Sequence, residues 1–191
     1  MNDDFMVFSG TANPALAEKV AAYLGRPLNK IDIKHFPDGE TFCQVIDPVR
    51  GKDVYVIQSG SPSPNEAYME LFVIMDALKR GSAARITAVI PYYGYARQDR
   101  KDQPRVPITA RLVANLLQTA GADRVITMDL HANQIQGFFD IPVDHIYGAN
   151  VLADYVQSLN LENLIVASPD VGGTKRASVF AKKLTALTKQ D

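Results

Sequence analysis

Short apolar runs alternate along the chain with longer stretches in which apolar residues recur every three or four positions. The short runs predict buried strands, and the longer stretches predict amphipathic helices. The strands predicted in this way are residues 5–8, 54–58, 86–90, 125–128 and 164–167. Because strands and helices alternate in this order, we expect an α/β fold with a doubly wound, mostly parallel sheet.

Caps and glycines mark the predicted helices. Asn13 followed by Pro14 predicts a first helix that Gly25 ends, and Asn65 is the predicted cap of a helix that reaches about residue 80. Pro107 predicts the start of a third helix, and residues 150–159 and 175–187 have the pattern of two more. We expect the apolar faces to pack in the core rather than hold a cofactor. The predicted faces of the first three helices are Leu16, Val20 and Leu24; Met69, Phe72, Val73, Met75 and Leu78; and Leu112, Val113, Leu116 and Leu117.

One segment departs from the alternation of strand and helix. Residues 31–36 and 41–46 are both strand-like, and Pro37-Asp38-Gly39-Glu40 lies between them. An Asp-Gly pair between two such runs is a strong signal for a hairpin turn. The sequence therefore predicts a β-hairpin added to the parallel sheet.

Composition and charge exclude several classes of protein. The 191 residues suggest one domain, or one domain and part of another. A net charge of −1 argues against a surface for nucleic acid or membrane, and there is no apolar stretch of transmembrane length. The single cysteine, Cys43, excludes an internal disulfide and any multi-cysteine zinc site. These features together predict a cytoplasmic protein.

Polar residues follow nearly every predicted parallel strand. They are Ser9-Gly10, Ser59-Gly60, the segment from Tyr92 onward, Asp129 with His131, and Asp170. The carboxyl ends of parallel strands share one edge of a sheet, so these groups can meet there. Each also has a structural reading, because Ser, Gly and Asp commonly cap helices and a histidine after a strand is often a loop residue. His131 with a carboxylate would suit a divalent ion bound beside phosphates, and the glycines after Asp170 would let backbone amides approach an anion.

The segment PYYGYARQDRKDQPR at residues 91–105 joins a predicted strand to a predicted helix. Such a connection needs only about two to six residues. This one is much longer and carries four cations: Arg97, Arg100, Lys101 and Arg105. Since Asp99 and Asp102 alternate with them, the segment could be a solvated charge run. As a binding loop it would suit a nucleoside triphosphate better than a nucleic-acid backbone, because arginine matches phosphate oxygens and the acids disfavour indiscriminate polyanion binding.

Five motifs in order give the chain a recognisable family resemblance. They are FPDGE at 36–40, YARQDRK at 95–101, ITMDLH at 126–131, QIQGFFDIPVD at 134–144 and SPDVGG at 168–173. The chain closely resembles ribose-phosphate pyrophosphokinase, the synthetase of 5-phosphoribosyl 1-diphosphate (PRPP), from about residue 7 to residue 184. The resemblance implies a phosphoribosyltransferase-like fold.

The resemblance also implies a reaction and a set of site residues. The diphosphoryl group of Mg–ATP would be transferred to the 1-hydroxyl of ribose 5-phosphate, giving PRPP and AMP. Homo-oligomers, with dimers assembled into hexamers, are implied as well, and the hairpin would serve a neighbouring subunit's site. The implied ATP-binding residues are Phe36, Asp38 and Glu40 around adenine, and Arg97, Gln98, Asp99 and Lys101 near the phosphates. The residues implied for Mg²⁺ are His131 and Asp170.

The chain is shorter than the family it resembles. We expect an α/β domain with the ATP-side motifs at 1–147 and the truncated start of a second, similar domain at 148–191. The family's flexible catalytic segment and its ribose 5-phosphate loop have no match here, so no catalytic residue is assigned and little turnover is expected of this chain alone. Residues 164–187 should be covered by a partner, poorly ordered or loosely docked.

Two alternatives stay open: a catalytically silent PRPP-synthetase-associated subunit, and a generic flavodoxin-like mononucleotide binder.

Overall fold

The computed structural model describes residues 5–188 and divides into two compact units between Ile146 and Tyr147. Each unit is described here by itself. Within residues 5–188, none of the helices combines the length and apolarity needed to cross a bilayer.

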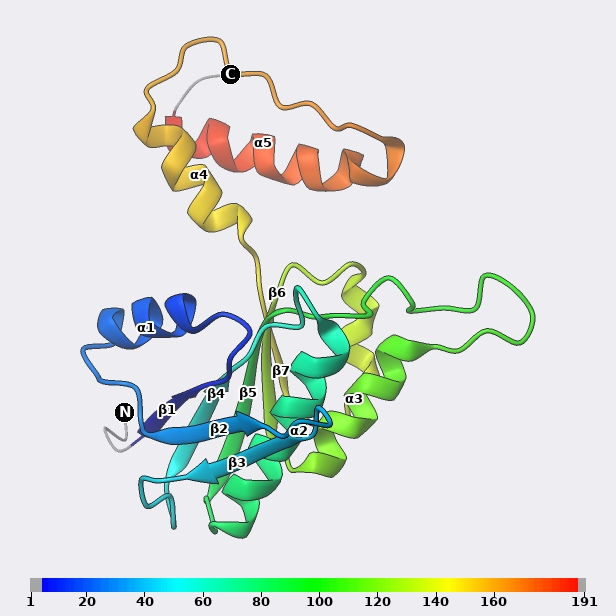
Figure 1. The fold of residues 1–191 in the computed structure, drawn as a ribbon. Helices are drawn as coiled ribbons and strands as arrows, with labels where there is room; N and C mark the ends of the chain where they lie inside the picture. Colours follow the sequence, from blue (N-terminus) through cyan, green and yellow to red (C-terminus); the bar gives the residue numbers. More distant parts are fainter. Residues whose placement is uncertain (1–4, 189–191) are drawn as a thin grey trace. The chain divides into compact units, whose positions relative to one another are not determined.

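A five-stranded parallel sheet forms the centre of the first unit (Figure 1). Its strands lie in the order β1-β4-β5-β6-β7, and every neighbouring pair is parallel. Their bounds are β1 Phe5–Ser9, β4 Asp53–Ile57, β5 Arg85–Tyr92, β6 Arg124–Met128 and β7 Val143–Ile146. The mostly parallel α/β fold predicted from the sequence is therefore confirmed. All the carboxyl ends of these strands lie along one edge.

Helices cover both faces of this sheet. From β4 to β6 each strand lies next to its predecessor in the chain, and right-handed crossovers then place α2 (Pro64–Arg80) and α3 (Thr109–Ala120) on the same face. The main core, which includes Phe8, forms between these helices and the sheet. Val7, the neighbour of Phe8, points to the opposite face and packs with Ala17 of α1 (Pro14–Tyr23).

The predicted hairpin is present as a separate two-stranded antiparallel sheet of β2 (Ile31–His35) and β3 (Thr41–Val45). Its inner side chains, Ile33 and Cys43 among them, pack against the main core, and β3 contacts α2. Burial raises the pKa of the Cys43 thiol to about 11, with Glu70 adding to the shift. Gly39 has φ +92°, a left-handed conformation that favours glycine, so the Asp-Gly turn forms as predicted.

The second unit consists of two packed helices, α4 (Ala149–Ser158) and α5 (Thr174–Thr188), with the 3₁₀ turn η2 (Val171–Gly173) before α5. The strand predicted at 164–167 is wrong, since these residues form no ladder and the Ile165 side chain is 90% exposed. A strand needs a neighbouring strand for its backbone hydrogen bonds, and the described part of this unit holds none.

The predicted helix faces are confirmed only in part: Met75 and Leu78 of α2 and Val113 and Leu117 of α3 are buried, but other predicted members are not. In α2, Met69 is 56% exposed, and Leu71 and Ile74 are buried instead. Alanines are buried in α1 and α3, Ala17 and Ala114 among them. Three larger residues of the predicted faces are exposed instead: Leu112 and Leu116 of α3, and Leu24, the C-cap residue of α1. Small side chains allow a helix backbone to approach the sheet closely, and a reading weighted by hydrophobicity overlooks them.

Two helix starts and one strand also differ from the prediction. Ser63, not Asn65, is the N-cap of α2, and α3 begins at Thr109 rather than at Pro107. After His131 the structure adds two elements that no sequence pattern indicated, the 3₁₀ helix η1 (Asn133–Phe138) and then β7. β7 has only four residues and one flanking proline, so its pattern is too short to recognise.

Candidate functional site

The basic loop, residues 93–108, begins at a close approach between two strand ends. A Cβ on Gly60, after β4, would lie 2.7 Å from the backbone N of Gly94. The buried Tyr68 of α2 donates a hydrogen bond from its hydroxyl to the Gly94 carbonyl (3.2 Å), and its ring stacks on Tyr95 with centroids 6.4 Å apart. Burial raises the pKa of Tyr68 well above its ordinary value, so its hydroxyl stays protonated and available as a donor. The first turn of the loop is therefore held against α2.

Gln98 attaches the middle of the basic loop to the start of α3. Its carbonyl accepts a hydrogen bond from the Ala110 amide (3.1 Å), and its side-chain oxygen accepts one from the Thr109 hydroxyl. The N-cap residue Ile108 provides no side-chain cap, so Gln98 satisfies an otherwise unpaired donor of the helix. Arg97 lies between Gln98 and the anchored Tyr95, although its own side chain is exposed.

The basic loop and the segment after β6 border a half-open cavity of about 470 Å³. Gln134 also connects the two walls through a long hydrogen bond to Asp99 (3.4 Å). The residues that line the cavity are Arg97, Gln98, Asp99, Arg100, Asp102, Val106, Pro107, His131, Ala132 and Gln134. Four residues predicted from the sequence therefore meet here: Arg97, Gln98, Asp99 and His131.

The charges of the loop are mostly uncompensated. Across residues 5–188, none of its four cations, Arg97, Arg100, Lys101 and Arg105, forms an ion pair. Arg97 and Arg100 face the same cavity as His131, and Lys101 is exposed without lining it. Free guanidinium groups at a concave site attract anions and match phosphate geometry. The segment that could have been a solvated charge run therefore places two of its cations, Arg97 and Arg100, at a concave site.

His131 follows a tightly held turn. Asp129 has φ +46°, and its amide donates a hydrogen bond to the Ile146 carbonyl (3.0 Å). The next amide, of Leu130, donates one to Nε2 of His145 (3.0 Å). Burial lowers the pKa of His145, an effect that Asp129 partly opposes. His145 was not identified from the sequence, because its role depends on β7 lying beside β6.

The remaining predicted residues lie elsewhere. Phe36, Asp38 and Glu40 are exposed at the tip of the hairpin and do not line the cavity. Asp38 is the centre of the turn there, since its carboxylate accepts a hydrogen bond from the Glu40 amide (3.2 Å). Asp170 belongs to the second unit, where its carboxylate caps η2 by accepting a hydrogen bond from the Gly173 amide (2.7 Å).

The cavity can accommodate a magnesium ion that phosphates and water carry. Within the described range there is no group of three His, Cys, Asp or Glu side chains placed to hold a metal. Mg²⁺ usually keeps several waters and takes only one or two protein ligands beside substrate phosphates. His131, Asp99 and Asp102 line one cavity and supply such donors, so the residues fit that mode of binding.

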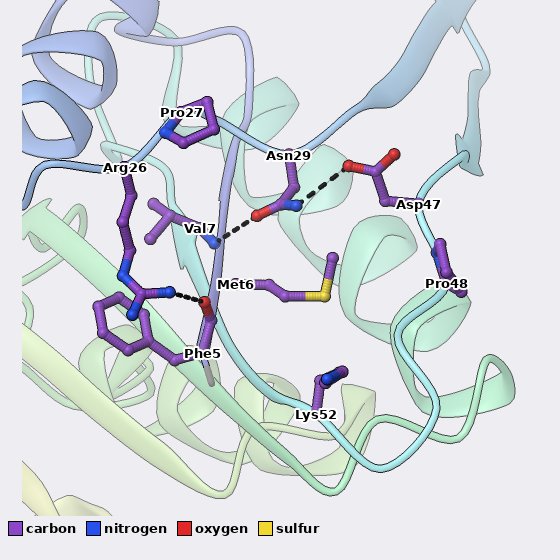
Figure 2. A pocket seen from close by; sticks show the side chains of 9 residues that line it. All are labelled: Phe5, Met6, Val7, Arg26, Pro27, Asn29, Asp47, Pro48 and Lys52. Carbon is purple, nitrogen blue, oxygen red and sulfur yellow. Dashed lines mark hydrogen bonds between the residues drawn. The ribbon is translucent and has the colours of Figure 1, made fainter. Parts of the chain in front are cut away.

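A second hollow, of about 390 Å³, has a structural explanation (Figure 2). It lies beside the outer edge of β1, where Asn29 donates its backbone N–H to the Val7 carbonyl and accepts the Val7 N–H on its side chain. Figure 2 also shows Asn29 bonded to Asp47, and Arg26 bonded to the Phe5 carbonyl. These contacts occupy the backbone groups of an edge strand that could otherwise pair with another chain.

A third hollow, of about 260 Å³, contains a buried carboxylate. Glu70 is 2% exposed and accepts hydrogen bonds from the Thr11 amide, the Thr11 hydroxyl and the Gln58 side chain, at 2.6–2.7 Å. Gly10 has no room for a side chain, because its Cβ would lie 2.4 Å from Gln58 Oε1. These hydrogen bonds satisfy the buried carboxylate within the protein, and they join the ends of β1 and β4 to α2.

Comparisons with known proteins agree with this architecture. A family model described as the N-terminal domain of ribose phosphate pyrophosphokinase matches residues 5–121, more than half of the chain. Ribose-phosphate pyrophosphokinase from Chlorobaculum tepidum is 57% identical over 96% of this chain and 57% of its own length. The Wolinella succinogenes protein of the same name is 57% identical over 94% of this chain and 58% of its own length.

A solved structure extends the likeness to the fold. The crystal structure of phosphoribosylpyrophosphate synthetase from Mycobacterium smegmatis matches with a TM-score of 0.90 and 47% identity. The match covers 95% of this chain and 61% of that one. The chain thus spans somewhat more than half the length of the relatives it matches, and on the family model, the sequence identities and the shared fold it belongs to the ribose-phosphate pyrophosphokinase family.

Proposed function

We propose that this chain provides the ATP side of a ribose-phosphate diphosphokinase. In this reaction the diphosphoryl group of Mg–ATP is transferred to the 1-hydroxyl of ribose 5-phosphate, giving PRPP and AMP. The proposal rests on membership of the family and on the chemistry of the cavity between the basic loop and His131. The sugar phosphate would be bound by segments to which the present residues have no match.

The cations without ion pairs around one cavity are the observation that carries the proposal. Arg97 and Arg100 face a space that His131 also lines. In phosphoryl transfer the protein mainly positions the substrate and neutralises the charge that spreads over the phosphate oxygens. Arg97 would contact the ATP phosphates with Gln98 beside it, and Asp99 and Lys101 would lie close by.

The hairpin tip would bind adenine in another copy of the chain. Phe36 would stack on the base, and Asp38 and Glu40 would hydrogen-bond its edge. All three are exposed and lie outside the cavity of their own chain, which supports a role in a neighbouring subunit's site. The active protein would then be a homo-oligomer.

We propose His131 in the first unit and Asp170 in the second, each taken by itself, as residues that would contact magnesium directly or through water. When bound, the ion would neutralise the phosphates and polarise the group that is transferred. Imidazole must be neutral at the ligating nitrogen to contact a metal. The cap that Asp170 provides to η2 keeps one of its oxygens oriented, which supports a fixed position for the carboxylate.

A second candidate is a catalytically silent subunit that joins synthetase oligomers. Such a subunit would need the hairpin and the fold but not free arginines around a cavity. The absence of ion pairs at the loop cations, among the residues that the structure describes, therefore favours the enzyme. We also propose that residues 1–147 form the ATP-side domain and that residues 148–191 begin a second domain.

Calorimetry with Mg–ATP, run beside an assay of AMP release with ribose 5-phosphate, tests the proposal. We expect this chain to bind Mg–ATP and to release little AMP. No binding of nucleotide would remove the ATP-side assignment. Rapid release of AMP would show that the acceptor is bound by residues already present in this chain.

A further inference from the structure

The turn between β6 and His131 has an unusual backbone that depends on β7. Asp129 is not glycine, yet it takes φ +46°, a left-handed conformation that most side chains avoid. Such a conformation persists only where surrounding contacts determine it. The first two residues after β6 are Asp129 and Leu130, and the backbone N–H of each donates a hydrogen bond to an acceptor on β7.

These two acceptors differ in kind. Asp129 donates to the Ile146 carbonyl, a backbone group that any residue at position 146 would offer. Leu130 donates to Nε2 of His145, a side-chain atom that only certain residues can replace. Leu130 is itself buried, and His131 is the next residue along the chain. The direction in which His131 leaves the turn therefore depends on the His145 ring.

From this geometry we infer that His145 is a positioning residue, which orients His131 by accepting the Leu130 N–H on Nε2. The inference rests on the proposed role of His131 beside magnesium and the ATP phosphates. His145 does not line the cavity, so it acts through the turn and not by contact with the ligand.

The bond also sets the chemical state of the His145 ring. A nitrogen that accepts an N–H carries no proton, so Nε2 is unprotonated and the ring is the neutral tautomer with its proton on Nδ1. A cationic ring would carry a proton on Nε2 and would face the Leu130 N–H with a second donor. Burial lowers the pKa of His145, which favours the neutral ring that the bond requires.

Two substitutions separate the acceptor from the shape of the side chain. His145→Leu removes the acceptor and fills much of the same space, whereas His145→Asn keeps a side-chain oxygen that can accept the Leu130 N–H. Asp144→Asn is the matched control, because Asp144 is on the same strand but contacts Arg124 (3.4 Å) and not the turn. Amide hydrogen exchange at Leu130 reports on the bond directly.

We expect exchange at Leu130 to become about fivefold faster in His145→Leu, the factor that corresponds to loss of one hydrogen bond of average strength. Calorimetry should show binding of Mg–ATP weakened by a similar factor, and binding of ATP without metal unchanged. His145→Asn should restore most of the slow exchange at Leu130 and most of the affinity for Mg–ATP. Asp144→Asn should match the wild type in both measurements. If His145 had a merely structural role, His145→Leu would weaken the binding of ATP equally with and without metal, and His145→Asn would not restore that binding.

Three results would overturn the inference: unchanged Leu130 exchange in His145→Leu, faster exchange with unchanged Mg–ATP binding, or equal losses with and without metal. Failure of the proposed function has a different signature, because the wild-type chain itself would then not bind Mg–ATP. In that case unchanged exchange at Leu130 would still refute the anchoring of the turn, and faster exchange would support it.

Discussion

At the scale of single residues, the site depends on which charged groups are already paired. Asp53 pairs with Arg85 and Asp76 with Arg80, both away from the basic loop. Arg97, by contrast, forms no ion pair within residues 5–188 and faces a cavity. A cation without a partner keeps its full attraction for an incoming anion.

Arg97→Ala should therefore weaken triphosphate binding more than adenosine binding. We expect a loss of roughly 10–100-fold for ATP, the range of one charge-assisted hydrogen bond, and little change for adenosine. Calorimetry with both ligands measures the difference. Arg80→Ala is the control, because Arg80 is exposed on α2 and pairs with Asp76. Equal losses for ATP and adenosine would mean that Arg97 has a structural role instead.

His145 makes stability depend on pH. Its pKa is lowered from an ordinary value of 6.5, mainly by burial, so the unfolded chain binds a proton at a higher pH than the folded protein does. The free energy of unfolding should therefore be greatest above pH 6.5 and should fall as the pH drops below it. Urea unfolding of the wild type and His145→Asn at several pH values checks this. Parallel curves for the two proteins would exclude His145 as the source.

At the scale of elements, the basic loop is held at its start and at its middle although it is long. Tyr68 of α2 anchors its start through Gly94, and Gln98 attaches it to the first turn of α3. Arg111 of α3 in turn donates to the Phe138 carbonyl and so holds the segment on the other side of the cavity. The helix α3 therefore holds both walls of the cavity, the basic loop and the segment after β6. This is why Arg97, Gln98, Asp99 and His131 line one cavity.

Gly60→Ala should disturb the anchored start of this loop. The new methyl would lie 2.7 Å from the Gly94 amide nitrogen and 2.8 Å from the Tyr92 carbonyl, both backbone atoms that cannot rotate away. We expect a loss of about 1–3 kcal/mol in the free energy of unfolding, the usual cost of overpacking. Gly137→Ala is the control, because a methyl there meets nothing within 4 Å. Similar losses for the two variants would refute the steric explanation.

Local signals explain which elements could be predicted. The Asp-Gly turn at Gly39 and the Asn13-Pro14 cap depend on neighbours in sequence, and both form as expected. The faces of α2 and α3 were partly wrong, because the choice between Met69 and Leu71 depends on how the helix lies on the sheet. β7 could not be recognised, since four residues become a strand only by pairing with β6.

At the scale of the whole molecule, the first unit holds the sheet and the cavity, and the second holds α4 and α5. The second unit buries Ala153 and Leu184 but leaves larger apolar side chains exposed. They include Val151, Leu152, Tyr155, Ile165, Val171 and Val179. A helix pair with so small a core contributes little burial to its own stability.

Hydrogen exchange should separate the two units. Residues 164–167 form no backbone ladder, so their amides should exchange at nearly the rate of an unstructured peptide. The amides of Val54 and Val56 on β4, a strand paired on both sides, should be protected by several orders of magnitude more. Comparable protection in 164–167 would show that these residues do pair as a strand in solution.

The amino-acid sequence by itself determined the α/β class, the hairpin, the family and the basic loop, because each of these follows from periodicity, turn chemistry or the order of motifs. Only the tertiary structure decided which residues share a site. It brought Arg97, Gln98 and Asp99 to His131, left Phe36 outside, and showed that His145 holds the turn before His131. Contacts between residues far apart in the chain depend on strand order and helix placement, and no local pattern encodes those distances.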